Sequence, residues 1–188
     1  MLKIPKPSPG EFAPYAAAYI DLVLEEVALL SHLRHGDNVV FDLVSRIPEA
    51  QLAVPFAPGE WTVKQILVHI IDQERVFAYR ALRFARGDTT ELATFNHDAY
   101  VETSKANQRS LDAILAEYRA VRQSTLTLFE GFDDSVLACA GKVGGHSTSV
   151  RALAWLIAGH ELHHLTSIRN NYVDGSATNR YNNREDIS

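Results

Sequence analysis

Apolar residues recur every three to four positions in four long stretches of this chain, and that spacing is the period of one face of an α-helix. Segments rich in proline or glycine, which end helices, separate the stretches. No segment alternates apolar and polar residues over a convincing length, and no internal repeat is present. The sequence therefore predicts an all-α protein, a four-helix bundle. The expected helices lie at about residues 12–47, 61–86, 107–129 and 149–172.

The two ends of the chain lack this helical spacing. Three prolines within residues 1–10 remove backbone donors and restrict the residues before them, so an extended lead-in is expected there. The polar residues 176–188 are expected to form a surface tail. A chain of 188 residues favours a single domain over residues 1–188.

Glycine and proline also mark the connections and one uncertain point inside the first helix. Residues 48–60 contain three prolines, and residues 87–100 begin at Gly87, so both segments are expected to be loops. Gly36 weakens a helix and Asp37 can cap a new one. Whether the first helix is continuous or broken near these residues stays open.

Charge and cysteine content narrow the possible partners and the compartment. The net charge is −5 and 22% of residues are charged, so nothing general favours binding to nucleic acid or to an anionic membrane. No stretch is long and apolar enough to span a bilayer, and the N-terminus does not fit a signal peptide. Cys139 is the single cysteine, which excludes an intrachain disulfide and suits a reducing compartment. We therefore expect a cytoplasmic protein.

Two histidines interrupt the apolar face of the fourth predicted helix. Residues four apart on a helix differ by about 40° around the axis and about 6 Å along it. The rings of His160 and His164 can therefore converge on one ion. The interior positions of this helix, at steps of four, three, four and four residues, are Leu153, Ile157, His160, His164 and Ile168.

The second predicted helix carries an imidazole on its apolar face in the same way. A polar side chain left unpaired in a core costs on the order of 1–3 kcal/mol, and three such costs are large beside about 5–15 kcal/mol of net stability. A divalent ion bound by His69, His160 and His164 would use the lone pair of each ring. A lone histidine is more often a hydrogen-bonded core residue, so the hypothesis depends mainly on the pair. The face of the second helix reads Ile66, His69, Gln73, Val76 and Arg80.

The segment GHELHH also matches the H-E-x-x-H signature of zinc peptidases. In that alternative His160 and His164 bind zinc, and Glu161 is the general base that acts on water. Such peptidases place this helix beside a sheet, and no strand is predicted here. The third ligand would have to follow His164, where Glu185 lies in the predicted tail. The peptidase is the less favoured alternative.

The other histidines are in weaker contexts. His163 lies about 100° around the helix from His164, so we do not expect it to share the ion. His97 and His146 fall in predicted loops, where they could line a substrate entrance, although surface histidines without function are commoner. The remaining two are His32 and His35.

At these residues the sequence resembles the DinB/YfiT-like superfamily of metal-binding helical bundles. The resemblance extends over nearly the whole chain, and its long blocks are much more specific than an isolated H-x-x-x-H. The matching stretches are PSPGEFAPYAAAYIDLV (7–23), APGEWTVKQILVHIIDQERVFAYRALRFARGD (57–88), FNHDAYV (95–101), RSLDAILAEYRAVRQSTLTLFEGF (109–132) and SVRALAWLIAGHELHHLTSIRNNY (149–172).

The resemblance implies one divalent ion, Ni(II) or Zn(II), with His69, His160 and His164 as its ligands. Members close to this pattern are described as metal-dependent hydrolases. Relatives include transferases and isomerases that use low-molecular-weight thiols such as bacillithiol or mycothiol, and many are homodimers. It thus implies a metal-dependent homodimeric enzyme that activates water or a thiol to act on a small-molecule substrate.

One segment departs from the family pattern. In close relatives the residues after the YIDLV-like stretch tend to form a Pro/Gly/Asp break. Here they are LEEVALLSHLRHGDN (24–38), which is typical of continued helix. Which surface the first helix contributes to a pocket or to a dimer therefore stays an open question.

Three neutral imidazoles leave a coordination position free, as in catalytic rather than structural zinc sites. Asp72, Gln73 and Glu161 lie within one helical turn of a ligand and could orient a ring or accept a proton. Arg80 and Arg151 fall on or near interior faces, where either could hold a substrate anion or be a snorkelling surface residue. The choice among these catalytic candidates stays open. So do two other classes of function: a non-catalytic metal or small-molecule binding module, and a structural bundle with incidental histidines.

Overall fold

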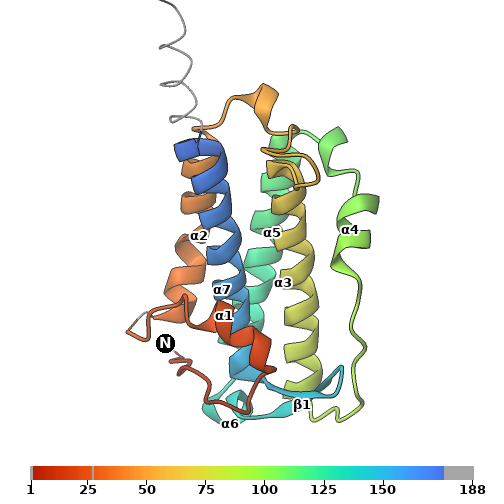
Figure 1. Cartoon of the computed structure of the whole chain (residues 1–188). Coiled ribbons are helices and arrows are strands. Elements are labelled where there is room, and N and C mark those ends of the chain that lie inside the picture. The colour runs from red at the N-terminus through yellow and green to blue at the C-terminus, as the bar shows by residue number, and fades with distance from the viewer. Residues whose placement is uncertain (1, 27, 176–188) are drawn as a thin grey trace, which may run out of the picture.

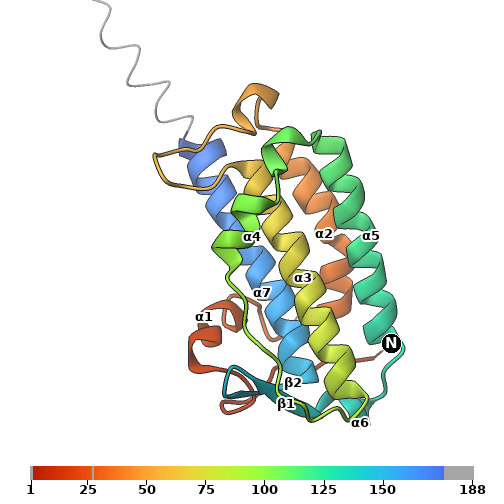
Figure 2. The same cartoon turned by 90° about the vertical axis from the view of Figure 1, so that its right-hand side faces the viewer.

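Four long helices run side by side and form a bundle in the computed structural model, which describes residues 2–26 and 28–175 (Figures 1 and 2). The expected all-α four-helix bundle is confirmed. The predicted tail, 176–188, lies outside the described residues. No helix of the described part has both the length and the apolarity to cross a membrane. The long helices are α2 (Leu29–Val44), α3 (Val63–Ala85), α5 (Leu111–Glu130) and α7 (Val150–Ile168).

Short elements precede α2, link the long helices and extend α7, and several of them cover one end and one side of the bundle. In both views α1, α6 and the strands gather at the end where α3 finishes and α7 starts, while α4 lies along α3 (Figures 1 and 2). They are η1 (Pro14–Ala16), α1 (Ala17–Ile20), η2 (Glu49–Gln51), α4 (His97–Thr103), η3 (Ala106–Gln108), α6 (Asp134–Leu137), β1 (Ala140–Val143), β2 (His146–Ser149) and η4 (Arg169–Asp174).

Side-chain caps fix where the two histidine-bearing helices begin. The Thr62 hydroxyl accepts from the backbone N–H of Gln65, and the Gln65 side chain accepts from the backbone N–H of Thr62, which is a capping box at the start of α3. The Ser149 hydroxyl likewise accepts from the backbone N–H of Ala152 at the start of α7. These caps fix the first residues of the two helices, and His69 and His160 lie on buried faces of those helices.

The prediction of one helix over residues 12–47 is wrong about where the break lies. α1 ends at Ile20 and α2 begins at Leu29, so the expected continuation through residues 24–38 does not occur. α1 instead packs on α7 through Gly159, where an added Cβ would lie 2.1 Å from the carbonyl oxygen of Tyr19. This close backbone contact holds α1 on α7 and apart from α2. Tertiary packing therefore outweighs the helix propensity of the residues between Ile20 and Leu29.

Gly36 does not break α2, because its role is close packing. A Cβ on Gly36 would lie 2.7 Å from Nη1 of Arg122 and 2.8 Å from Oε1 of Glu161. The helix passes through this point without interruption. The glycine therefore makes room for a buried polar cluster between α2, α5 and α7.

Two further elements were not predicted. β1 and β2 form a small antiparallel hairpin whose turn, Gly144–Gly145, has positive φ at both glycines. Strands of four residues are too short to show an alternating pattern in the sequence. The expected loop over 87–100 also ends early, because Asn96 caps α4 by accepting from the backbone N–H of Ala99.

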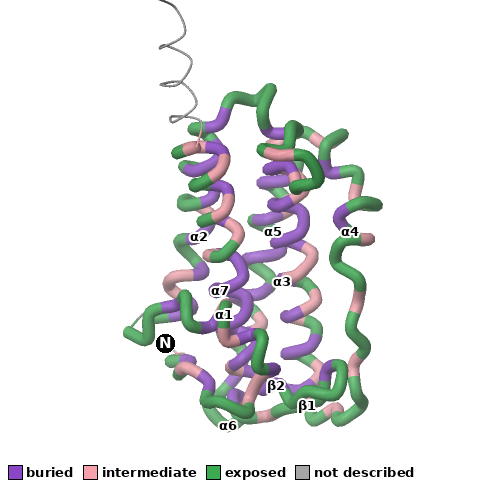
Figure 3. Tube along the Cα trace, in the orientation of Figure 1, coloured by how far each residue is buried: buried purple, intermediate pink, exposed green. Residues whose placement is uncertain are grey.

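Buried apolar side chains form two clusters, one in each half of the bundle, on the inward faces shown in purple in Figure 3. Each long helix contributes one of its halves to each cluster. Between them lie buried polar residues from α3, α5 and α7, so a polar layer crosses an otherwise apolar core. Its members include His69, Glu74, Arg122, His160 and Glu161.

Candidate metal centre

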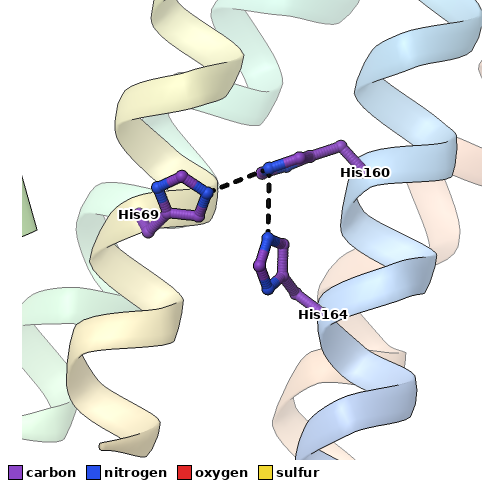
Figure 4. Close-up of side chains that lie close together, drawn as sticks. All are labelled: His69, His160 and His164. Carbon is purple, nitrogen blue, oxygen red and sulfur yellow. Dashed lines mark hydrogen bonds between the residues drawn. The ribbon is translucent and has the colours of Figure 1, made fainter. Parts of the chain in front are cut away.

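Three imidazole rings from α3 and α7 point toward one another inside the polar layer (Figure 4). Nε2 of His160 lies 3.0 Å from Nε2 of His69 and 3.1 Å from Nε2 of His164. All three ligand atoms lie within 4.8 Å of one another, and His69 and His160 are buried while His164 is half-buried. The structure thus brings together the three residues that the sequence selected.

Hydrogen bonds alone satisfy this arrangement poorly. Nε2 of a neutral imidazole carries either one hydrogen or one lone pair, so His160 can make only one well-directed bond with its two neighbours. Nitrogen ligands about 2.0–2.1 Å from a tetrahedral ion lie about 3.3 Å apart, which is close to the two short separations found here. One divalent cation would engage all three lone pairs at once, so the residues fit such an ion.

Burial keeps the three rings in the neutral form that binds metals. It lowers the pKa of His69 to about 4, with a further contribution from His97. Burial and the nearby His69 lower the pKa of His164 to about 3. The pKa of His160 is also lowered, first by burial and then by His164 and His69. Neutral imidazole with a free lone pair is the ligand form of histidine.

These shifts predict that the metal-free protein loses stability in mild acid. The unfolded histidines take up protons near pH 6.5, whereas folded His69 and His164 do so only near pH 4 and 3. The contribution of these rings to the free energy of unfolding is therefore fully present above pH 6.5 and falls as the pH is lowered toward 4, by up to about 1.4 kcal/mol per pH unit for each ring. Urea titrations of chelator-treated protein between pH 7.5 and 4.5 measure this slope.

The matched control for that slope is the double variant His69→Ala with His164→Ala, in which the slope should be much shallower. Equal slopes in the two proteins would show that these rings titrate normally.

Aromatic rings surround the histidine cluster. The ring centroid of Trp61 lies 4.8 Å from that of His69, and the ring of Tyr19 lies 5.5 Å from that of His160. Phe77 meets His160 edge-on at 6.1 Å. None of these three aromatic residues was predicted to lie at the site. Trp61 and Phe77 fall within the second predicted helix, where aromatic residues are common in any core, and Tyr19 contacts His160 because α1 packs on α7.

A pocket of about 380 Å³ opens from the cluster along α3, within the usual size range of small-molecule sites. His69, His160, Gln73 and Arg80 all line it. Asp72 does not: its carboxylate lies 3.4 Å from Nη1 of Arg75, and burial raises its pKa. Of the catalytic candidates on α3, Gln73 and Arg80 therefore face the pocket and Asp72 does not line it.

Glu161 lies in a different part of the polar layer, between α7, α5 and α3. Its carboxylate accepts from Nη2 of Arg122 and, at 2.5 Å, from the hydroxyl of Tyr118. Arg122 also binds Glu74 with Nε at 2.9 Å and Nη2 at 2.8 Å, and donates to the carbonyl oxygen of Leu33. Glu161 does not line the pocket. This placement gives it no direct path to a water at the histidine cluster, which disfavours the peptidase alternative.

The remaining polar candidates lie outside the cluster. His163 is exposed and packs against Tyr19 at a ring distance of 5.2 Å. His97 lines the pocket at the start of α4, with its ring 5.8 Å from that of His69. Arg151 pairs with Glu11 and does not line the pocket.

The other histidines lie elsewhere in the protein. His146 lies beside Tyr15 at a ring distance of 6.2 Å. His35 bonds the carbonyl oxygen of Ser31, and Nε2 of His32 is buried without a partner among the described residues. Glu185 lies outside the described residues.

The fold and the cluster define a helical bundle with a candidate metal centre. A family model described as the DinB superfamily matches residues 32–168, which include most of each long helix and all three histidines. The chain belongs to the DinB superfamily.

Solved structures with the same fold are similar over most of this chain. YfiT from Bacillus subtilis, described as a probable metal-dependent hydrolase with an unusual four-helix bundle topology, is 17% identical with a TM-score of 0.68 over 76% of this chain and 84% of that one. A mycothiol-dependent maleylpyruvate isomerase is 14% identical with a TM-score of 0.62 over 80% of this chain, which spans 62% of the isomerase. The DinB-like protein YjoA from Bacillus subtilis is 17% identical, with a TM-score of 0.56 over 79% and 91% of the two chains. No curated protein matches the chain.

Proposed function

We propose that this protein is a metal-dependent enzyme that binds one divalent ion, Ni(II) or Zn(II), through His69, His160 and His164. The observation that carries the proposal is the convergence of three neutral imidazoles at a pocket, with no carboxylate or cysteine among the described residues in the cluster. Three histidine ligands with an open position are the pattern of catalytic zinc, and nitrogen-rich sites also suit nickel.

A divalent ion held in this way would supply Lewis acidity and lower the pKa of a water or thiol that reaches it. The chain's own residues would prepare the site for that chemistry. Trp61 and Phe77 would restrict water on two sides of the rings, since both pack against them. Gln73 has no side-chain hydrogen-bond partner among the described residues and could bond a polar group of the substrate. His97, exposed at the pocket, could carry a proton between the site and solvent.

Two reaction types fit this site, and the similar structures support one each. YfiT is described as a probable metal-dependent hydrolase, which supports activation of water. The isomerase is mycothiol-dependent, which supports activation of a low-molecular-weight thiol. We therefore propose that the protein acts on a small molecule either as a hydrolase or as a thiol S-transferase. A low-molecular-weight thiol would be the co-substrate of the transferase. We also propose the homodimer that the family resemblance implies.

Metal analysis followed by an activity panel tests the proposal. Protein purified without a histidine tag should contain about one nickel or zinc ion per chain. Chelation should abolish activity in a panel that combines conjugation of a thiol to an electrophilic acceptor with hydrolysis of esters and amides, and re-addition of the ion should restore it. Conjugation alone would identify a transferase, and hydrolysis without thiol would identify a hydrolase.

The alternative of a non-catalytic binding module predicts metal without activity in either half of the panel. The alternative of a structural bundle predicts protein that retains no ion and loses no stability on chelation. Either result would overturn the enzymatic proposal.

A further inference from the structure

Arg80 is a buried cation for which the described part of the chain provides no anionic partner. It is 8% exposed and lines the pocket that contains His69 and His160. Its Nη2 donates to the carbonyl oxygen of Ala93 at 3.2 Å, and among the described residues it forms no ion pair. Burial lowers the pKa of its guanidinium, with only Tyr15 acting in the opposite direction.

Arg80 differs from two other arginines of the protein, both of which are paired with carboxylates. Arg122, which is 3% exposed, is more deeply buried than Arg80 and binds two carboxylates, those of Glu74 and Glu161. Arg151, which is more exposed than Arg80, is paired with Glu11. Because a buried charge without a counter-ion is strongly unfavourable, the guanidinium of Arg80 is ready to accept an anion from the pocket.

The distance between Arg80 and the histidine cluster determines how long a molecule must be to contact both. His69, Gln73, Phe77 and Arg80 follow one another at steps of four, four and three residues and all line the pocket. His69 and Arg80 are about 16 Å apart along the axis of α3. The wall between the two ends is largely apolar and includes Phe77, Leu153 and Leu156.

We propose that Arg80 binds the carboxylate of an elongated, apolar-bodied small molecule whose opposite end reaches the histidine cluster. The proposal rests on the proposed function, because it assigns the substrate class of the same site. A guanidinium pairs with the two oxygens of a carboxylate through parallel hydrogen bonds. A phosphate monoester carries about −1.5 to −2 charges, so one guanidinium would leave part of that charge unpaired. Arg80 is the only arginine or lysine among the described residues that line the pocket, and its single charge therefore favours the carboxylate.

Binding of a matched set of probes tests this assignment. Isothermal titration calorimetry would compare 3-phenylpropionate, its neutral amide 3-phenylpropionamide, and phenethyl phosphate, using the full chain as purified and again after removal of metal. The carboxylate should bind about ten-fold or more tightly than the amide in both preparations, because a charged hydrogen bond is lost in the amide. It should also bind more tightly than the phosphate.

Variants of Arg80 separate its charge from the pocket shape. Arg80→Gln should bind the acid and the amide equally, and Arg80→Lys should keep part of the preference. Arg86→Gln removes an exposed arginine just after α3 and should behave as the wild type. Arg80→Gln should also unfold at the same or a higher temperature, because it removes a buried unpaired charge. A purely structural role would instead lower the unfolding temperature and leave the binding preference intact.

Several results would overturn the proposal. They are equal affinity of the wild type for acid and amide, a retained preference in Arg80→Gln, tighter binding of the phosphate, and absence of carboxylate binding at millimolar concentration. Because the preference is also measured without metal, a protein that binds no ion can still pass this test. Conversely, a metal-loaded active protein can fail it. Failure of this proposal and failure of the enzymatic proposal are therefore distinguishable.

Discussion

Replacing His160 with alanine should abolish stoichiometric metal binding and any metal-dependent activity. Nε2 of His160 lies within about 3 Å of the nitrogens of both other histidines, so it occupies the centre of the cluster. Loss of residues that merely support a ligand commonly weakens metal binding about 10–100-fold, and loss of a ligand itself should weaken it further. Elemental analysis after dialysis should find less than about a tenth of an ion per chain, beside about one for the wild type.

The neighbouring histidine provides the control for that substitution. His163 is exposed, lies three residues after His160 and is absent from the cluster. His163→Ala should keep the metal content and activity of the wild type, while circular dichroism verifies that both variants fold. A His160→Ala protein with full metal content would refute the ligand assignment.

Replacing Arg122 with alanine should destabilise the fold by about 3–5 kcal/mol. Arg122 is 3% exposed, and its removal would leave Glu74 and Glu161 as buried carboxylates without their cation. Burial alone would lower the pKa of Arg122, but Glu161 and Glu74 outweigh it and raise that pKa. Urea denaturation measures the loss as a change in the free energy of unfolding.

Arg119 is the matched control one helical turn earlier on α5. It pairs with Asp37 through two contacts of 2.9 Å, but half of its side chain is exposed. Arg119→Ala should cost about 0–1 kcal/mol because water screens and replaces a surface ion pair. Equal losses for the two variants would contradict the view that the buried cluster holds the bundle together.

The sequence was sufficient to predict the bundle because apolar residues recur at the helical period in all four long helices, even though α3 buries every residue of 66–71 and α7 every residue of 152–161. Residues such as Thr62 and Ser149 also stand where the helix caps are needed. The break between α1 and α2 was misplaced because it depends on a contact distant in sequence. The backbone of Tyr19 packs directly against Gly159, where there is no room for a side chain. The sequence of residues 21–28 contains no local pattern that indicates this contact.

The histidine cluster could be selected from the sequence because polar residues interrupted apolar faces. The same test applied to α5 would have found Arg122, which stands among the buried positions Tyr118, Thr125 and Phe129. The direction of Glu161 could not be predicted in this way. Its carboxylate turns to Arg122 and Tyr118, residues of another helix, and spacing along α7 alone does not specify such partners.

The polar layer thus has two parts with different chemistry. On one side three neutral imidazoles meet at a pocket, and on the other Arg122 compensates two carboxylates. His160 and Glu161 are adjacent in sequence but serve different parts, because neighbours on a helix point about 100° apart.

X-ray absorption spectroscopy of the zinc-loaded protein tests the central interpretation most directly. Ligation by His69, His160 and His164 predicts a zinc environment with three imidazole nitrogens at about 2.0–2.1 Å and the scattering pattern of intact rings. The imidazole contribution should fall in the His69→Ala protein loaded in the same way. An environment of oxygen atoms alone, or one containing sulfur at about 2.3 Å in the absence of added thiol, would contradict it.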